Sequence, residues 1–289
     1  MIKLEKTEVV GWEAAIRGMR NPKNSWDKSD SVMKNTILVE EEVCPGVTAM
    51  VSKPCEPYIS IGPNDHDLMI RLAKGGPVHA KYRRMIVVYV DITAPLYWWK
   101  EFDTYKVGTV ANSCSTMHKL TEKGFTVSDI SMDMLCRGNL VDMEGKPNSP
   151  ELKAHYKHQT NILNSLNNLR DLYLKTGDKK YWRCMIEMLP SSYNQKRTVM
   201  MNYEVLSNIY YSPRYNHKLD EWRYFCSWIE SLPYSEIILA KQEKEEDKIT
   251  VMFNKLDEKF QQQVIEYIED MLNGQKMADR ILKHAEDER

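Results

Sequence analysis

The apolar and polar positions of the chain follow different periods in its two halves. In the first half, residues 84–93 (RMIVVYVDIT) are rich in β-branched and aromatic side chains and predict the strongest strand of the protein. Residues 2–10 alternate and predict a second, short strand, whereas residues 36–43 fit either a strand or a short helix. Residues 44–63 contain four prolines, so this segment is expected to be irregular or built of short extended pieces.

Helical spacing dominates the second half. Between residues 152 and 176, apolar side chains recur at intervals of three and four, and Gly177 suits the end of a helix. Pro95 directly follows the strongest strand and fits the first position of a short helix. Along the whole chain, the spacing of apolar residues and the positions of proline and glycine predict helices at 12–19, 65–73, 96–105, 152–176, 181–188, 196–211 and 220–230.

The C-terminal region has a character of its own. The charged run 241–248 (KQEKEEDK) fits a linker or a solvated helix face. An apolar stripe at helical spacing follows it, with Asn254 as a candidate cap, and predicts a docking or oligomerisation helix over 254–285. We therefore expect an α+β domain over 1–235, with a central antiparallel or mixed sheet flanked by helices. A charged linker and an amphipathic C-terminal helix are expected over 236–289.

Charge and composition disfavour several classes of function. The 40 basic and 41 acidic residues cancel, so no net field attracts nucleic acid or an anionic membrane. The six cysteines are scattered, without a CxxC pair or a spacing suited to zinc. The N-terminal residues lack the apolar core of a signal peptide, and no apolar run is long enough to span a membrane. We expect a reduced, cytoplasmic protein that binds no metal, membrane or nucleic acid.

Candidate chemistry is concentrated in residues 94–119 (APLYWWKEFDTYKVGTVANSCSTMHK). The segment turns polar soon after the strongest strand and offers carboxylates, cations and small hydrogen-bonding side chains. A buried polar group without a partner costs ~1–3 kcal/mol, so a purely structural element has little use for so many of them. The segment predicts a binding site for a polar ligand that carries phosphate.

Several landmarks along the chain occur in a characteristic order. They are the helix WEAAIRGM (12–19), the strand that leads into Ala94-Pro95, the pair Leu189-Pro190, then Asn202, Asn208 and Arg214 before HKLDEW (217–222). Over residues 1–230 this order resembles the flavin-dependent thymidylate synthases (ThyX), which methylate dUMP. The resemblance implies FAD, NADPH and methylenetetrahydrofolate as cofactors. It also implies a pyrimidine nucleotide as substrate and a homotetramer with flavin sites between subunits.

The signature of that family, RHRxxSxNExSxRY, is only partly kept in this chain. Thr104, Tyr105 and Lys106 occupy the RHR positions, so Lys106 alone retains a cation there. With a shift of one residue, Asn112 and Ser115 match the Asn and the second Ser of the motif. Lysine lacks the planar fork of arginine, which weakens bidentate phosphate recognition. The resemblance implies cofactor contacts from Lys106, Asn112 and Ser115.

The downstream part of the resemblance also mixes matches and departures. Asn202 and Asn208 match two flavin-contacting asparagines of the family, six residues apart. Arg214 lies one position late for the arginine that reads the pyrimidine, and Glu204 stands where the family has an arginine. The remaining assignments implied by the resemblance are cofactor binding by His79, and substrate binding by Arg183 and Glu101.

Each of these residues also has a purely structural interpretation. Lys106 is equally compatible with an ordinary surface lysine, and asparagine and serine commonly cap helices and turns. No catalytic side chain is assigned, because in this family flavin and folate perform the chemistry and the protein orients them. The sequence leaves open a flavoenzyme acting on dUMP or a related nucleotide, a non-catalytic nucleotide-binding relative, and an interaction protein that uses the 254–285 helix. It does not decide whether the chain is an enzyme.

Overall fold

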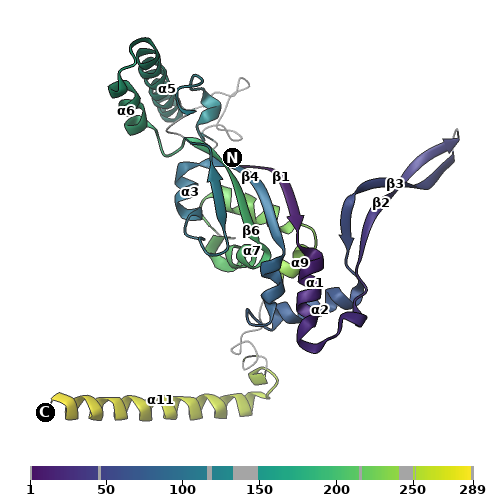
Figure 1. The fold of residues 1–289 in the computed structure, drawn as a ribbon. Helices are drawn as coiled ribbons and strands as arrows, with labels where there is room; N and C mark the ends of the chain where they lie inside the picture. Colours follow the sequence, from purple (N-terminus) through teal and green to yellow (C-terminus); the bar gives the residue numbers. More distant parts are fainter. Residues whose placement is uncertain are drawn as a thin grey trace.

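The computed structural model is a mixed α and β architecture with two antiparallel sheets (Figure 1). The larger sheet has four strands in the spatial order β1 (Lys3–Val10), β4 (Val87–Pro95), β6 (Asn194–Asn202) and β5 (Val110–Ser113). The smaller is a two-stranded hairpin of β2 (Val32–Cys44) and β3 (Val47–Ser60). The residues that the structure describes are 2–44, 47–115, 119–132, 149–214, 217–240, 250 and 252–287.

The strand β4 alternates between two environments, as the period of a half-buried strand requires. Val88, Val90 and Ile92 are completely or almost completely buried in the main core. Tyr89, between them, points to the opposite face and is 40% exposed. The four-stranded sheet is therefore covered on one face and largely exposed on the other.

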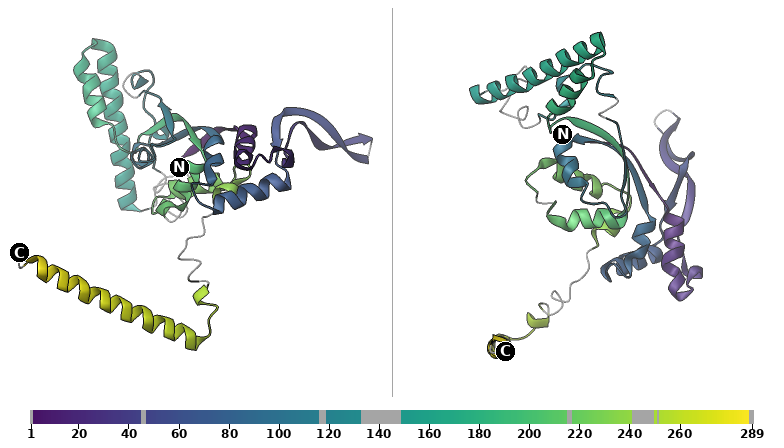
Figure 2. Two further views of the ribbon diagram at one scale, coloured as in Figure 1. Left: turned by 60° about the horizontal axis from the view of Figure 1, so that its bottom comes forward. Right: turned by 60° about the vertical axis from the view of Figure 1, so that its left-hand side comes forward.

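The helices α3, α7, α8 and α9 supply the other side of the main core (Figure 2). Trp98 and Trp99 of α3 are buried, and Trp98 packs against Trp222 and Phe225 of α8. This aromatic cluster explains the Trp98-Trp99 pair as core packing. The helices on this side are α3 (Leu96–Phe102), α7 (Tyr203–Ile209), α8 (Asp220–Glu230) and α9 (Ser235–Leu239), and the short π-helix Tyr210–Arg214 follows α7.

The hairpin β2–β3 is anchored to the body through the buried carboxylate of Asp65. Asp65 accepts hydrogen bonds from Nε of Arg20 at 2.6 Å and from the hydroxyls of Ser29 and Ser31 at 2.7 Å each. These bonds join α1 (Trp12–Arg20), the turn before β2, and α2 (Pro63–Lys74). Three 3₁₀-helices lie in the connections, at Asn21–Lys23, Trp26–Lys28 and Ala80–Met85.

A second hydrophobic cluster lies apart from the main core. It is formed by α5 (Pro150–Thr176), α6 (Lys179–Met188) and residues 120–132, which include the 3₁₀-helix Val127–Asp129. Leu166 and Met185 are fully buried in it. Figure 1 shows α5 and α6 side by side at the end of the molecule opposite α11 (Glu258–Asp287). Among the described residues, no helix is long and apolar enough to cross a membrane.

The predicted α+β class is confirmed, and so are the helices at 12–19, 65–73, 152–176, 181–188 and 220–230, within a few residues at each end. The additional C-terminal helix is also present as α11. Its cap is Asp257 instead of Asn254, because Oδ1 of Asp257 accepts from the backbone N–H of Phe260 at 3.0 Å. Pro95 ends β4 and immediately precedes α3, so it is not the first helical residue.

Two predictions about secondary structure are wrong. Residues 196–211 are not one helix: β6 occupies Asn194–Asn202 and pairs with β4, whose buried position requires a neighbour on each side. Residues 44–63 were expected to be irregular or built of short extended pieces, but most of them form the single long strand β3. Pro54 and Pro57 are tolerated there because each strand of a two-stranded ribbon has one unpaired edge.

Candidate functional site

The exposed face of the four-stranded sheet brings together residues from all four strands. The register places Glu5 of β1 beside Asp91 of β4, Asp91 beside Thr198 of β6, and Thr198 beside Asn112 of β5. These four side chains therefore lie in one line across the sheet, and we call this line the polar row. The neighbouring row, Glu8, Tyr89, Met200 and Val110, is more apolar.

The centre of the polar row is a hydrogen-bonded carboxylate. Thr198 donates from its hydroxyl to Oδ1 of Asp91 at 2.6 Å, and Nζ of Lys196 lies 3.0 Å from Oδ2. The Thr198 hydroxyl, followed by Lys196, lowers the pKa of Asp91 below its ordinary value. Asp91 is thus an ionised acceptor, and the amide of Asn112 is exposed two strands away.

A cavity of about 230 Å³ lies at the end of this face, next to the polar row. Lys119, Lys123 and Lys196 line it, so its wall is rich in cations. Each cation already has a carboxylate partner: Lys119 pairs with Glu122 at 2.6 Å and Lys123 with Asp129 at 2.7 Å. The cavity also contains neutral hydrogen-bonding groups, from Thr93, Cys114, Ser115, Ser128, Asn194 and Gln195.

The loop before β5 packs against Asn202. Gly108 has φ +77°, and a Cβ there would lie 3.0 Å from Nδ2 of Asn202 and from Val205. Oδ1 of Asn202 accepts from the backbone N–H of Val205 at 3.0 Å and so caps α7. This capping bond uses Oδ1 of Asn202, and Nδ2 takes no part in it. Thr109 Oγ1 in the same loop is buried and has no hydrogen-bond partner among the described residues.

Glu101 lies on the helix-covered side of the sheet, away from the polar row. It accepts from Nε1 of Trp222 at 2.9 Å, and its Oε2 is 3.5 Å from Nε2 of His217. Tyr105 lies in the loop after α3, and its hydroxyl is 2.9 Å from Oγ of Ser212. This contact ties the loop to the π-helix whose last residue is Arg214.

The structure brings only part of the predicted site together. Asn112 and Asn202 lie on the exposed face, Ser115 lines the cavity at its end, and Lys106 is exposed in the loop before β5. Three other predicted residues lie elsewhere. Asn208 is exposed on α7, Arg183 pairs with Glu187 on α6 at 2.9 Å, and exposed His79 lies beside Gly75 at the end of α2.

Glu204, at the position where the resemblance implies an arginine, is buried. Its Oε2 lies 3.7 Å from Nη1 of Arg83. Nη2 of Arg83 donates to the carbonyls of Ile237 and Ala240, the second at 2.8 Å. The Arg83 guanidinium therefore holds α9 and the residue after it against α7, and the pair has an architectural role.

Asp91, Lys196 and Thr198 belong to no motif in the sequence and were not among the predicted site residues. A signal was present, because Tyr89, Asp91 and Thr93 alternate with apolar residues in β4. The pairing of β4 with β6 could not be predicted while 196–211 was interpreted as a helix. Register across strands, rather than any motif, assembles the polar row.

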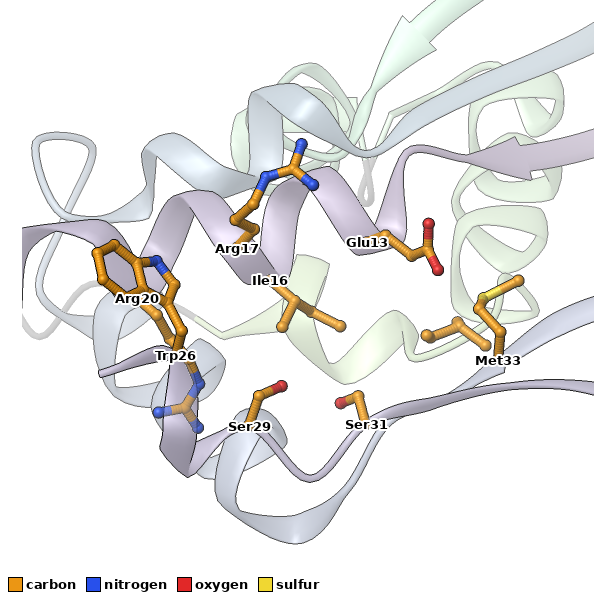
Figure 3. Close-up of a pocket in the computed structure, with 9 residues that line it drawn as sticks. Glu13, Ile16, Arg17, Arg20, Trp26, Ser29, Ser31 and Met33 are labelled. Atoms are coloured by element: carbon orange, nitrogen blue, oxygen red, sulfur yellow. The ribbon is translucent and has the colours of Figure 1, made fainter. Parts of the chain in front are cut away.

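A second cavity, of about 390 Å³, lies between α1 and the start of the hairpin. Figure 3 shows Ile16 of α1 facing Ser29 and Ser31 across it. Arg20 also lines this cavity, but Asp65 already engages its guanidinium. None of the residues predicted from the sequence lies here. Across the described residues, no group of histidine, cysteine and carboxylate side chains is arranged to hold a metal ion.

Comparison with known proteins identifies the fold. No family model and no curated protein matches the sequence. A solved structure of thymidylate synthase X (ThyX) from Helicobacter pylori with FAD and dUMP is 14% identical, with a TM-score of 0.52 over 83% of this chain and 97% of that one. A second Helicobacter pylori ThyX structure, complexed with FAD and dUMP, is 16% identical, with a TM-score of 0.52 over 83% and 100%.

A UMP/dUMP methylase, PolB from Streptomyces cacaoi bound with 5-Br dUMP, is 12% identical, with a TM-score of 0.47 over 83% of this chain and 95% of that one. At the identities of the two Helicobacter pylori structures, similarity in structure establishes the fold alone. This chain therefore has a ThyX-like α+β fold.

Proposed function

We propose that this chain binds FAD and a pyrimidine nucleotide on the exposed face of its four-stranded sheet. We further propose that it transfers one carbon from methylenetetrahydrofolate to dUMP or a related nucleotide, with NADPH as reductant. The observation that carries the proposal is the gathering of Asn112, Ser115 and Asn202 along one face of a ThyX-like sheet. The similar Helicobacter pylori proteins were solved with FAD and dUMP.

The side chains at this face fit the phosphate-bearing parts of such ligands. Lys196 supplies a cation, and Asn112 and Ser115 supply neutral hydrogen-bonding groups. Lys106, exposed in the loop before β5, is proposed as a second cation for the ligand. The buried Thr109 hydroxyl, which has no partner in the described part of the chain, is a further group that a ligand could satisfy. Bound FAD and folate would supply the redox and one-carbon chemistry, and these residues would neutralise and orient the ligands.

A homotetramer is part of this proposal. The single chain leaves Glu5, Thr198 and Asn112 of the polar row exposed at the sheet face, together with their apolar neighbours Tyr89 and Val110. A ligand bound there would be only half enclosed, whereas small-molecule sites normally bury most of their ligand. A second copy of the chain against this face would complete the enclosure.

A second candidate is a nucleotide-binding protein without flavin chemistry. The Arg83–Glu204 pair favours it, because a buried carboxylate replaces a cation that the resemblance assigns to ligand binding. A charge-assisted hydrogen bond contributes about 1.5–3 kcal/mol, so each missing arginine weakens phosphate binding substantially. In this case the exposed face would bind a nucleotide alone.

Purification of the full chain with FAD added, followed by absorbance at flavin wavelengths and mass spectrometry of bound ligand, tests the proposal. A flavin spectrum and a thermal shift with dUMP or dCMP would support it. A thermal shift with nucleotide but not with FAD would support the second candidate. A colourless protein that shows no shift with FAD, dUMP or dCMP would exclude both.

Paired variants connect the result to the site. Lys196→Met should abolish most of the shift, because it removes a cation from the exposed face. Lys180→Met is the matched control, since Lys180 is an exposed lysine on α6 that pairs with Asp178. Equal loss of the shift in both variants would place the binding site elsewhere.

A further inference from the structure

The cavity of about 390 Å³ between α1 and the start of the hairpin has the size of a small-molecule site. We call it the hairpin-base cavity. It is separate from the proposed ligand face, because none of the four residues of the polar row lines it. Small-molecule sites combine an apolar lining with a few polar groups that are available to a ligand. The hairpin-base cavity has both features.

The apolar lining of this cavity favours an aromatic ligand group. Ile16 and Ile59 are buried in its wall, whereas the indole of Trp26 is 51% exposed. Met33 is exposed to a similar extent, and Figure 3 shows Ile16 between Trp26 and Met33. Nε1 of Trp26 donates to Oδ1 of Asn21 at 2.8 Å, which holds the indole in place. Because an indole and a thioether both make favourable contacts with aromatic rings, the apolar part of a ligand here should be aromatic.

Two exposed residues of α1, Glu13 and Arg17, add one charge of each sign to the rim of the cavity. They are four residues apart with the glutamate first, which is the spacing and order at which helices commonly form an ion pair. No ion pair joins them, and neither has a charged partner within the described ranges of the chain. Both charges are therefore available to a ligand.

The other charges at the cavity compensate each other. Arg20 is almost completely buried, and its Nε donates to Oδ1 of Asp65 at 2.6 Å. Its Nη1 donates to the carbonyl of Ser25 at 3.1 Å, whereas Nη2 has no acceptor among the residues that the structure describes. Since Arg20 is neutralised by Asp65, and Glu13 balances Arg17, the cavity has no net charge. A nucleotide or another phosphate dianion would bring a charge that nothing in the lining compensates.

We propose that the hairpin-base cavity binds a free aromatic α-amino acid. Such a zwitterion has no net charge, and it carries an ammonium group and a carboxylate on the same carbon. Side chains four residues apart on a helix have Cβ atoms about 5–6 Å apart. A ligand carbon between Glu13 and Arg17 therefore presents its ammonium group to the glutamate and its carboxylate to the arginine. The aromatic ring then enters the apolar part of the cavity, between Trp26 and Met33.

Other small molecules match this lining less well. An aromatic acid without an amine leaves Glu13 unpaired, and an aromatic amine without a carboxylate leaves Arg17 and Nη2 of Arg20 unpaired. The end of a peptide carries only one of the two charged groups beside its aromatic side chain. The free amino acid alone satisfies both rim charges and the apolar lining, and this match gives the cavity its specificity.

Isothermal titration calorimetry on the full-length chain tests the proposal with L-phenylalanine, N-acetyl-L-phenylalanine and L-phenylalanine amide. At about pH 6.5 the free amines of these probes are protonated and the carboxylates are ionised. L-phenylalanine should bind best, and each analogue should bind about tenfold more weakly, because it lacks one charge-assisted contact.

Variants of the two rim residues assign each contact. Arg17→Met should weaken binding of L-phenylalanine by about tenfold without weakening binding of the amide, which has no carboxylate. Glu13→Gln should weaken binding of L-phenylalanine without weakening binding of the N-acetyl analogue, which has no ammonium group. Arg71→Met is the matched control, since Arg71 is an exposed arginine on α2 that pairs with Asp67.

Several outcomes would overturn the proposal. Absence of binding by all three probes would exclude it, and equal binding of all three would show that the rim charges do not contact the ligand. Tighter binding of the N-acetyl analogue than of L-phenylalanine would indicate an acid or a peptide end instead. Trp26→Leu should weaken all three probes by about fivefold, and unchanged binding would place the ring elsewhere. The thermal shift with dUMP should be the same in Arg17→Met as in the unmodified chain, so this test is independent of the proposed function.

Discussion

Lys196 and Asp91 form an ion pair across the β4–β6 pairing, with Nζ 3.0 Å from Oδ2. The pair occupies the middle of the exposed sheet face, between Glu5 on one side and Asn112 on the other. The Asp91 carboxylate therefore partly neutralises the positive charge of Lys196. Any anionic ligand on this face therefore competes with Asp91 for Lys196.

Because the ligand and Asp91 compete for Lys196, substitutions of Asp91 and of Lys196 should change the affinity for dUMP in opposite directions. Asp91→Asn should tighten binding of dUMP by about threefold to tenfold, because it removes a negative charge and releases Lys196. Lys196→Met should weaken binding by about tenfold or more. Isothermal titration calorimetry at two salt concentrations measures both effects. Weaker binding by Asp91→Asn would indicate that Asp91 contacts the ligand directly.

The Asp65 carboxylate predicts an acid-sensitive anchor for the hairpin. Burial alone would raise its pKa, but hydrogen bonds from Ser31, Ser29 and Arg20 outweigh burial and lower the pKa below its ordinary value. A lowered pKa stabilises the fold above the unfolded-state value near pH 4, and this contribution is lost as the pH falls through the lowered folded-state value.

Urea unfolding at pH 7 and at about pH 3 measures this contribution. Asp65→Asn should lower the free energy of unfolding at pH 7 by about 3 kcal/mol, because it leaves Arg20 buried without its charge partner. The difference between wild type and variant should shrink in acid. A difference that is the same at both pH values would show that ionisation of Asp65 is not the source of stability.

Asn202 allows its structural and ligand-binding roles to be separated. Its Oδ1 caps α7, so Asn202→Ala should cost about 1 kcal/mol in the free energy of unfolding. Asn202→Asp keeps the cap and should keep the stability. Thermal denaturation measures the first effect and titration with dUMP the second. Loss of ligand binding in Asn202→Asp, with stability unchanged, would place the anionic ligand near the amide end of Asn202.

The Arg83–Glu204 pair predicts that substitution of Arg83 costs more stability than substitution of Glu204. Arg83→Met should destabilise the protein by about 3 kcal/mol, because it frees the buried Glu204 carboxylate and the carbonyls of Ile237 and Ala240. Glu204→Gln should cost less, since Arg83 keeps both carbonyl contacts. A double-mutant cycle from urea unfolding measures the coupling. Equal losses in the two single variants would contradict this assignment.

The sequence predicted the elements whose patterns are local. Residues 152–176 have helical spacing and a terminal glycine, and α5 ends at Thr176 with Gly177 at φ +69°. The segment 84–93 carried the signal of a central strand and became β4. The ligand contacts of Asn112 and Ser115, inferred from a motif, stay a prediction.

The sequence could not predict what depends on a neighbouring strand. Residues 194–202 have a weak local preference, and their pairing with β4 makes them a strand. That pairing then aligns Asp91, Thr198 and Asn112, which are far apart along the chain.

Local patterns in the sequence were enough for the α+β class, for most of the helices and for the amphipathic C-terminal helix. The pairing of Glu204 with Arg83 and the capping of α7 by Asn202 emerged only once the chain was packed. The physical reason is that side-chain roles depend on partners brought by other elements. A sequence pattern predicts on which face of a helix or strand a side chain lies. The residues that this face contacts depend on how the whole chain packs.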